Sequence, residues 1–142
     1  MREWAREARL ADGRRVIDAE WVRLNLARVH AKAEFLKLMN WRIASSPPEV
    51  SAGVAEARPP GPAAASATKV YGTEFAVEAY RLLMEVLGAG ALVRSGSPGE
   101  VLAGRIERQH RAALILTFGG GTNEVQRDIV AMAGLGLPAA RR

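Results

Sequence analysis

The chain has 142 residues, of which 49% are hydrophobic, and this content favours one globular domain over a disordered segment. It contains no cysteine, which excludes a disulfide framework and thiolate chemistry. The formal net charge is +5, yet the basic residues are scattered among Asp and Glu instead of gathered into one patch, so we expect no nucleic-acid partner.

Other classes are disfavoured by what the sequence lacks. The opening MREWAREARLADGRR is charged throughout and does not resemble a signal peptide, and no apolar run approaches the length of a membrane span. We therefore expect a cytoplasmic protein without membrane insertion. His30 and His110 lie far apart and without a carboxylate pattern of metal-ligand spacing, so we expect no metal site.

Helical periodicity begins near the N-terminus. The segment REWAREARL is typical of the last turns of a helix, and no capping residue precedes it. From Asp18 to Ala44 apolar residues recur every three or four positions, which predicts an amphipathic helix. Asp18 and Glu20 suit its start, where the helix dipole favours negative charge.

A proline-rich loop is expected over residues 46–63. The stretch SSPPEVSAGVAEARPPGPAAAS holds five of the seven prolines of the chain and few long apolar side chains. A second helix is predicted from about Ala63 to Leu87. Its apolar residues cover more than one face, so we expect much of it to be buried, and Gly88 and Gly90 end it.

A third helix is predicted to start at Pro98 and to run to Thr117. Ser97 can cap it, Pro98 suits the first helical position, and Glu100 would complete a capping box. The glycine triplet 119–121 then breaks the helix.

A fourth, short helix follows the triplet, with Asn123 and Gln126 as a possible cap pair, and GLGLP ends it. No strand pattern competes with these helices. The predicted fold is therefore one all-α domain over residues 1–142, an antiparallel, up-and-down bundle of four helices.

The segment FGGGTNEVQRDIVAMAGLGLP resembles the C-terminal signature of the acyl-CoA dehydrogenase family. The upstream segments ARVHAKAEFLKLMNWR and SATKVYGTEFAVEAYRLLMEVLGAGALV, followed by RIERQHRAALILTFGGGTNEVQR, keep the order of elements of that family. The resemblance implies the C-terminal helical bundle without its first helix, of which REWAREARL would be the end. The N-terminal helical domain and the middle β domain of the family have no counterpart here.

The resemblance also implies the chemistry. Members bind FAD and oxidise an acyl-CoA thioester: a base removes the α-proton while hydride leaves the β-carbon for the flavin. Gly121 would lie beside the acyl-CoA, and Thr122, Asn123 and Glu124 would contact FAD. Backbone N–H groups beside small residues suit such contacts. The alternative is that the triplet merely joins two helices.

Two departures from the family pattern stand out. Many members carry their catalytic glutamate at the position of Gly120, which has no side chain to take a proton; others carry it on the first bundle helix, which this chain lacks. No catalytic residue is therefore assigned. In MEVLGAG the family usually has Gln and paired glycines near the FAD pyrophosphate of a neighbouring subunit. Here Glu85, Gly88 and Ala89 stand there, so Glu85 either approaches FAD or faces solvent.

Two functions remain open at this stage. The chain could be the flavin-side and oligomerisation domain of an FAD-dependent acyl-CoA dehydrogenase, present as a fragment or split subunit and inactive alone. It would then hold FAD and acyl-CoA only with the missing domains or a partner subunit. Alternatively, it could be a non-catalytic structural or regulatory bundle that pairs with another acyl-CoA dehydrogenase subunit. In either case the isolated chain should expose apolar surface and self-associate into a dimer or a larger oligomer. The expected partners are acyl-CoA dehydrogenase subunits, in a homo- or hetero-oligomer.

Overall fold

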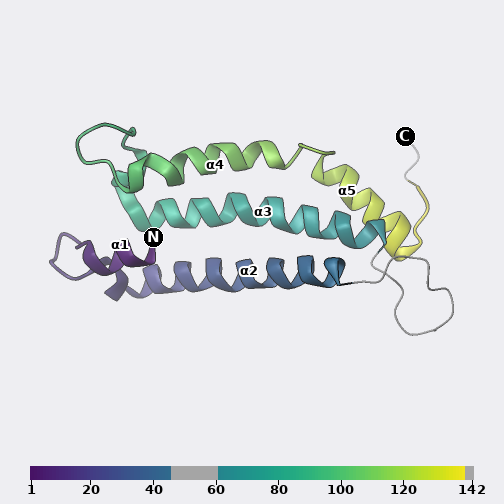
Figure 1. Ribbon diagram of the computed structural model, residues 1–142, viewed down its shortest axis with the longest axis horizontal. Helices are drawn as coiled ribbons and strands as arrows, with labels where there is room; N and C mark the ends of the chain where they lie inside the picture. The colour runs from purple at the N-terminus through teal and green to yellow at the C-terminus, as the bar shows by residue number, and fades with distance from the viewer. Residues whose placement is uncertain (46–60, 140–142) are drawn as a thin grey trace. The chain divides into compact units, whose positions relative to one another are not determined.

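Residues 1–45 and 61–139 are described by a computed structural model, and these residues are helical with turns between the helices (Figure 1). Their only extended pairing is an isolated bridge between Arg9 and Arg15, so the all-α prediction is confirmed for this part of the chain. The elements in chain order are α1 (Arg2–Glu7), η1 (Val16–Asp18), α2 (Glu20–Ala44), α3 (Pro62–Leu87), η2 (Gly88–Leu92), η3 (Leu102–Gly104), α4 (Arg105–Leu116), α5 (Asn123–Ile129) and the π-helical turn η4 (Val130–Gly134). None of the described helices is long and apolar enough to cross a membrane.

The chain divides into two compact units. Unit 1 consists of residues 1–33 and 75–114, and unit 2 of residues 34–74 and 115–142. The helices α2, α3 and α4 each contribute residues to both units.

Unit 1 has an apolar core. Ala5 of α1 and Val22 of α2 are fully buried, and Val16, Ala19 and Val86 complete the cluster. The α2 and α3 segments of this unit are antiparallel. Two contacts show this, because the higher-numbered residue of α2 pairs with the lower-numbered residue of α3. Asn25 Nδ2 donates to Glu85 Oε2 over 3.1 Å, and Lys32 forms an ion pair with Glu78.

Unit 2 is built differently, because its buried residues in the described part of the chain are the polar Ser66, Thr68 and Asn123. Apolar contacts here are only partly shielded from solvent. A side chain at Gly72 would begin 3.3 Å from Leu36 Cδ1, so its absence lets these segments of α2 and α3 approach closely.

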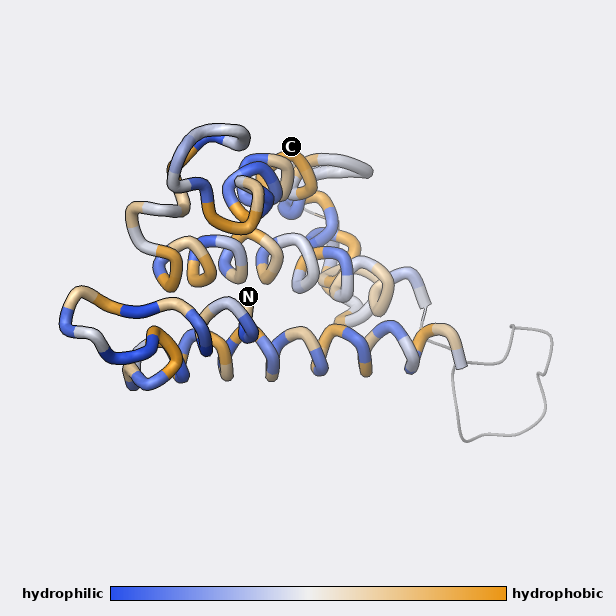
Figure 2. The backbone as a smooth tube through the Cα atoms, turned by 60° about the vertical axis from the view of Figure 1, so that its left-hand side comes forward, coloured by the Kyte–Doolittle hydropathy of each residue, from blue (hydrophilic) through white to orange (hydrophobic). Residues whose placement is uncertain are grey.

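Exposed apolar side chains gather in unit 2. Those on α2 are Phe35, Leu38 and Trp41; those from the end of α4 onward are Ile115, Leu116, Phe118, Val125, Met132, Leu135 and Leu137. Figure 2 shows hydrophobic residues recurring between hydrophilic ones along α2, the long helix at the bottom of that view. This amount of exposed apolar surface is typical of an interaction surface.

The start of α2 differs slightly from its prediction. The helix begins at Glu20, because Asp18 belongs to the short η1 turn and accepts hydrogen bonds from Arg15 Nε and Nη2, both at 2.9 Å. The hydrogen bonds from the guanidinium of Arg15 hold the pKa of Asp18 below its ordinary value. The predicted end at Ala44 is confirmed.

The second predicted helix corresponds closely to α3. It begins at Pro62, so residues 62 and 63 belong to the helix and not to the predicted loop. Residues 46–60 of that loop lie outside the described residues. The helix ends at Leu87, and Gly88 follows with a φ of +59°.

The predicted start of the third helix is wrong. Residues 97–101 form turns, and α4 begins only at Arg105. The cause is backbone conformation: Leu102 and Ala103 have φ values of +51° and +54°, which a right-handed helix excludes. Glu100 does not complete a capping box with Ser97, since its Oε2 accepts from the N–H of Gly96 at 2.6 Å. The helix ends at Leu116, one residue before the prediction.

Replacing Val22 by Ala should destabilise the chain by roughly 2 kcal/mol, because the change removes two buried methyl groups and leaves a cavity. Urea unfolding followed by circular dichroism would measure the loss. Leu24→Ala on the same helix is the control, since Leu24 is 49% exposed and should change the free energy of unfolding little. Equal losses for the two variants would contradict the assignment of the core to unit 1.

The chain should self-associate through the exposed face of α2 in unit 2. The double variant Leu38→Glu/Trp41→Glu places charges among these apolar side chains, so its average mass should fall toward that of the monomer in light scattering. Asn40→Glu adds a charge to the same helix at an exposed polar position and should leave the mass unchanged. A monomeric unmodified chain at all concentrations would refute this expectation.

Candidate functional site

The glycine triplet forms a tight turn between α4 and α5. Gly120 and Gly121 have φ values of +70° and +93°, a region that residues with a side chain rarely adopt. A Cβ atom at Gly120 would meet no described heavy atom within 4 Å, whereas one at Gly121 would lie 3.0 Å from Gln126 Nε2. The glycines are therefore needed for the path of the backbone, and position 120 opens onto free space.

Some carbonyl groups of this turn accept hydrogen bonds from the chain itself. Thr117 O accepts from the N–H of Asn123 at 3.0 Å, and Gly120 O accepts from Gln126 Nε2 at 3.2 Å. By contrast, the N–H groups of Gly120, Gly121 and Thr122 form no backbone hydrogen bond with the described residues. The turn thus offers N–H donors to a ligand.

The capping residue of α5 is Thr122. Its Oγ1 accepts from the N–H of Val125 at 3.3 Å, which corrects the prediction of Asn123 and Gln126 as a cap pair. Asn123 is instead the first residue of the helix and is only 4% exposed. Its side chain points into unit 2 because a set of polar groups binds it there.

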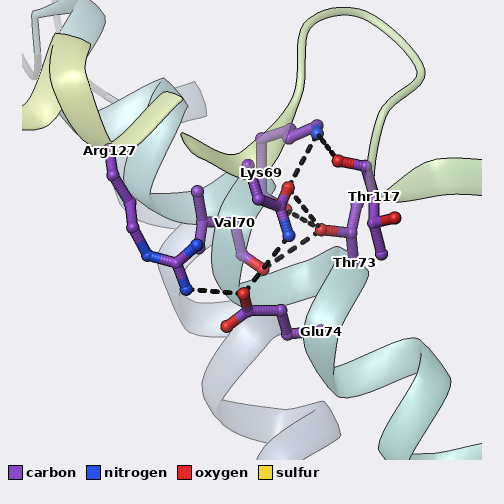
Figure 3. A network of polar contacts seen from close by, with 7 residues as sticks. Lys69, Val70, Thr73, Glu74, Thr117 and Arg127 are labelled. Atoms are coloured by element: carbon purple, nitrogen blue, oxygen red, sulfur yellow. Dashed lines mark hydrogen bonds and ion pairs between the residues drawn. The ribbon is translucent and has the colours of Figure 1, made fainter. Parts of the chain in front are cut away.

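Lys69 of α3 belongs to this set, and Figure 3 shows it with Thr73, Glu74, Thr117 and Arg127. Its Nζ donates to Asn123 Oδ1 and to Gly121 O, both at 2.8 Å, and to Thr117 O at 3.3 Å. Thr73 Oγ1 lies 3.1 Å from Asn123 Oδ1. One lysine therefore ties the end of α4, the glycine turn and the start of α5 to α3.

Glu74 extends the network on its other side. Its Oε1 accepts from Asn123 Nδ2 at 3.3 Å and from Arg127 Nη2 at 2.5 Å. Glu74 and Glu78 are four residues apart on α3, a spacing at which two like charges repel each other weakly. In the structure each carboxylate has its own cation, Arg127 for Glu74 and Lys32 for Glu78.

The sequence did not predict Lys69, Thr73 or Arg127 as site residues. One signal was available for Lys69, since it is the only charged residue between positions 62 and 73. Its partners could not be read from spacing, because they lie 48 to 54 residues farther along the chain.

Glu124 and Thr122 are exposed beside the turn. The pKa of the Glu124 carboxyl is held below its ordinary value, first by a hydrogen bond from its own backbone N–H and then by one from the hydroxyl of Thr122. Glu124 is therefore a carboxylate at neutral pH. The predicted site residues Gly120, Gly121 and Thr122 to Glu124 all lie together in unit 2.

The second predicted segment, Glu85, Gly88 and Ala89, belongs to unit 1. The carboxylate of Glu85 accepts from Asn25 Nδ2 at 3.1 Å and from Arg81 Nη1 at 2.5 Å, so its charge is matched within the chain. Gly88 and Ala89 are exposed. No group of three or more His, Cys, Asp or Glu side chains among the described residues could hold a metal ion.

Comparison with known proteins gives consistent results. Residues 1–135 match the family described as "Acyl-CoA dehydrogenase, C-terminal domain". The chain is 65% identical over 142 residues to acyl-CoA dehydrogenase FadE26 of Mycobacterium tuberculosis, covering 100% of this chain and 34% of that protein. It is 34% identical over 130 residues to acyl-CoA dehydrogenase FadE29 of the same organism, covering 89% of this chain and 30% of that protein.

Solved structures agree with these matches. A chain of the ChsE4–ChsE5 complex from Mycobacterium tuberculosis has a TM-score of 0.85 and 64% identity, over 99% of this chain and 33% of that one. A chain of the Tcur3481–Tcur3483 steroid ACAD has a TM-score of 0.75 and 45% identity, over 88% of this chain and 30% of that one. The chain thus spans about a third of the length of these relatives. With its helical fold and a family match over nearly its full length, the chain belongs to the acyl-CoA dehydrogenase family.

Proposed function

We propose that the chain is the flavin-side and oligomerisation domain of an FAD-dependent acyl-CoA dehydrogenase and that it is active only together with the rest of such an enzyme. The observation that carries this proposal is the glycine turn. It presents the N–H groups of Gly120, Gly121 and Thr122 without backbone partners among the described residues, beside the exposed hydroxyl of Thr122. These donors suit the acceptor atoms of a flavin or of a thioester carbonyl.

The residues predicted to contact FAD differ in how well they could bind it. The N–H groups of the turn can donate to it, whereas the hydroxyl of Thr122 could do so only by giving up its hydrogen bond to Glu124. Asn123 would act indirectly, since its side chain is bound within unit 2. Glu85 offers no donor and its charge would repel a diphosphate, so a contact from that segment would fall to the exposed backbone around Gly88 and Ala89.

When bound, FAD would accept hydride from the β-carbon of the acyl group. This chain would contribute the glycine turn to the site, and Gly120 would leave the space beside the turn free of a side chain. Gly120 carries no group able to take the α-proton, so the base must come from another part of the assembled enzyme.

The substrate class we favour is the thioester of a bulky, steroid-like acyl group. One relative of known structure, 45% identical, is a steroid ACAD. The open space at Gly120 supports the same conclusion, because a Cβ there would meet no described atom within 4 Å.

The partner we favour is a second acyl-CoA dehydrogenase subunit. The ChsE4–ChsE5 and Tcur3481–Tcur3483 structures are both complexes of two named components. The exposed apolar side chains of unit 2, such as Leu38, Trp41 and Phe118, would be covered in such an assembly.

The second candidate function is a structural or regulatory bundle that supports a catalytic partner. The missing base at Gly120 and the carboxylate at Glu85 favour it. The two functions differ in whether the glycine turn of this chain contacts the flavin, and the following experiment separates them.

Thr122→Val should lower the flavin content of an enzyme assembled from this chain and the rest of its 65% identical relative. The variant removes the hydroxyl and also a helix cap worth about 1 kcal/mol. Thr122→Ser keeps both and should retain the flavin, as measured by absorbance after gel filtration. If Thr122→Val leaves flavin content and activity unchanged, the second candidate function is favoured.

Gly120→Ala should lower kcat/KM for a steroid acyl-CoA about tenfold while changing kcat/KM for a short acyl-CoA much less, because the added methyl group occupies the space open at this position. The control is Gly119→Ala, whose Cβ would be 3.4 Å from Ile115 O and whose φ is not positive. Equal losses with both substrates would indicate backbone strain alone and would refute the proposed substrate class.

A further inference from the structure

Side-chain donors hold two consecutive peptide groups of the glycine turn. The carbonyl oxygen of Gly120 accepts from Gln126 Nε2 at 3.2 Å, and that of Gly121 accepts from Lys69 Nζ at 2.8 Å. Each interaction fixes the rotation of one peptide plane about the chain direction.

The direction of the N–H groups follows from these contacts. A trans peptide is planar, so its N–H points opposite to its C=O. The peptide group that contains Gly121 O also contains the N–H of Thr122, and the one with Gly120 O contains the N–H of Gly121. Lys69 and Gln126 therefore turn these two N–H groups away from themselves, and neither N–H has a backbone partner among the described residues.

Lys69 is suited to this task by its geometry. An ammonium group has three N–H donors that can rotate together, and Lys69 Nζ has three oxygen acceptors within 3.3 Å. These acceptors are Thr117 O, Gly121 O and Asn123 Oδ1. A planar guanidinium spreads its donors over a fork and could not direct three of them at oxygens that surround one point.

The acceptor groups are themselves fixed. Asn123 is 4% exposed, and its Nδ2 donates to Glu74 Oε1 at 3.3 Å. The Thr73 hydroxyl lies 3.1 Å from its Oδ1, and it shares its one proton among that oxygen and the carbonyls of Lys69 and Val70. Arg127 in turn holds Glu74. Lys69 Nζ is thus anchored to the buried amide of Asn123, so it can hold the carbonyl group of Gly121 in one orientation.

We propose that Lys69 is a positioning residue that keeps the N–H groups of the glycine turn directed at the ligand. That a ligand binds at the turn rests on the proposed flavin-side function. The effect of Lys69 on the orientation of the turn does not depend on that function. Without Lys69 the Gly121–Thr122 peptide loses the donor that holds its carbonyl oxygen, and the preceding residues Gly120 and Gly121, with φ values of +70° and +93°, restrain its rotation little.

The first test uses the 142-residue chain and needs no ligand. In Lys69→Met, ¹⁵N relaxation should show order parameters of Gly121 and Thr122 falling from about 0.85 to below about 0.6, while those of α3 stay high. The control is Lys32→Met, which removes a lysine paired with Glu78 in unit 1 and should not change the turn. Unchanged order parameters in Lys69→Met would overturn the proposal.

A second variant covers the case in which Lys69→Met does not fold. Lys69→Arg keeps the charge and the long stem, yet it should also lower the order parameters of Gly121 and Thr122, because the fork cannot serve three oxygens. If Lys69→Arg leaves the turn as rigid as in the unmodified chain, the proposal is wrong.

The functional test uses the assembled enzyme described above. Lys69→Met should raise the Kd for FAD about tenfold, whereas Lys32→Met should not. If the unmodified assembly binds no FAD, the proposed function fails while the relaxation result still decides the role of Lys69. If FAD binds equally to the unmodified and Lys69→Met assemblies although the turn is loosened, the link from Lys69 to the ligand is refuted.

Discussion

The structure around the glycine turn depends on one buried amide, that of Asn123. A polar side chain removed from water costs about 1–3 kcal/mol if it lacks partners, so the groups around Asn123 must supply them. Lys69, Thr73 and Glu74 do so, all from two turns of α3. This requirement places α5 on α3 in one register and fixes the turn that precedes it.

The two units show two ways of ordering helices. In unit 1 close-packed apolar residues such as Ala5 and Val22 specify the arrangement, and van der Waals contact provides the energy. In unit 2 the described buried residues are polar, so directional hydrogen bonds specify it and much apolar surface stays exposed. A unit with this composition is suited to completing its apolar packing against other chains or domains.

Much of the fold could be predicted from local sequence. Apolar periodicity and Gly88 located α2 and α3 to within two residues, because helix signals act within one or two turns. The start of α4 could not be predicted, since Leu102 and Ala103 have positive φ values that their residue types do not favour. The motif FGGGTNE located the turn, but Lys69 was missed because its contacts are tertiary.

Gly120 links the geometry of the turn with its chemistry. The turn needs a φ of +70° at this position, which would cost a residue with a side chain about 1–2 kcal/mol. Glycine removes that strain and leaves open space, but it also removes any group that could take a proton. The turn is therefore better suited to orienting donors toward a ligand than to acid–base chemistry. For such a turn, fixed orientations of the peptide planes matter more than a reactive side chain. Lys69 and Gln126 fix them through hydrogen bonds to the carbonyl oxygens of Gly121 and Gly120.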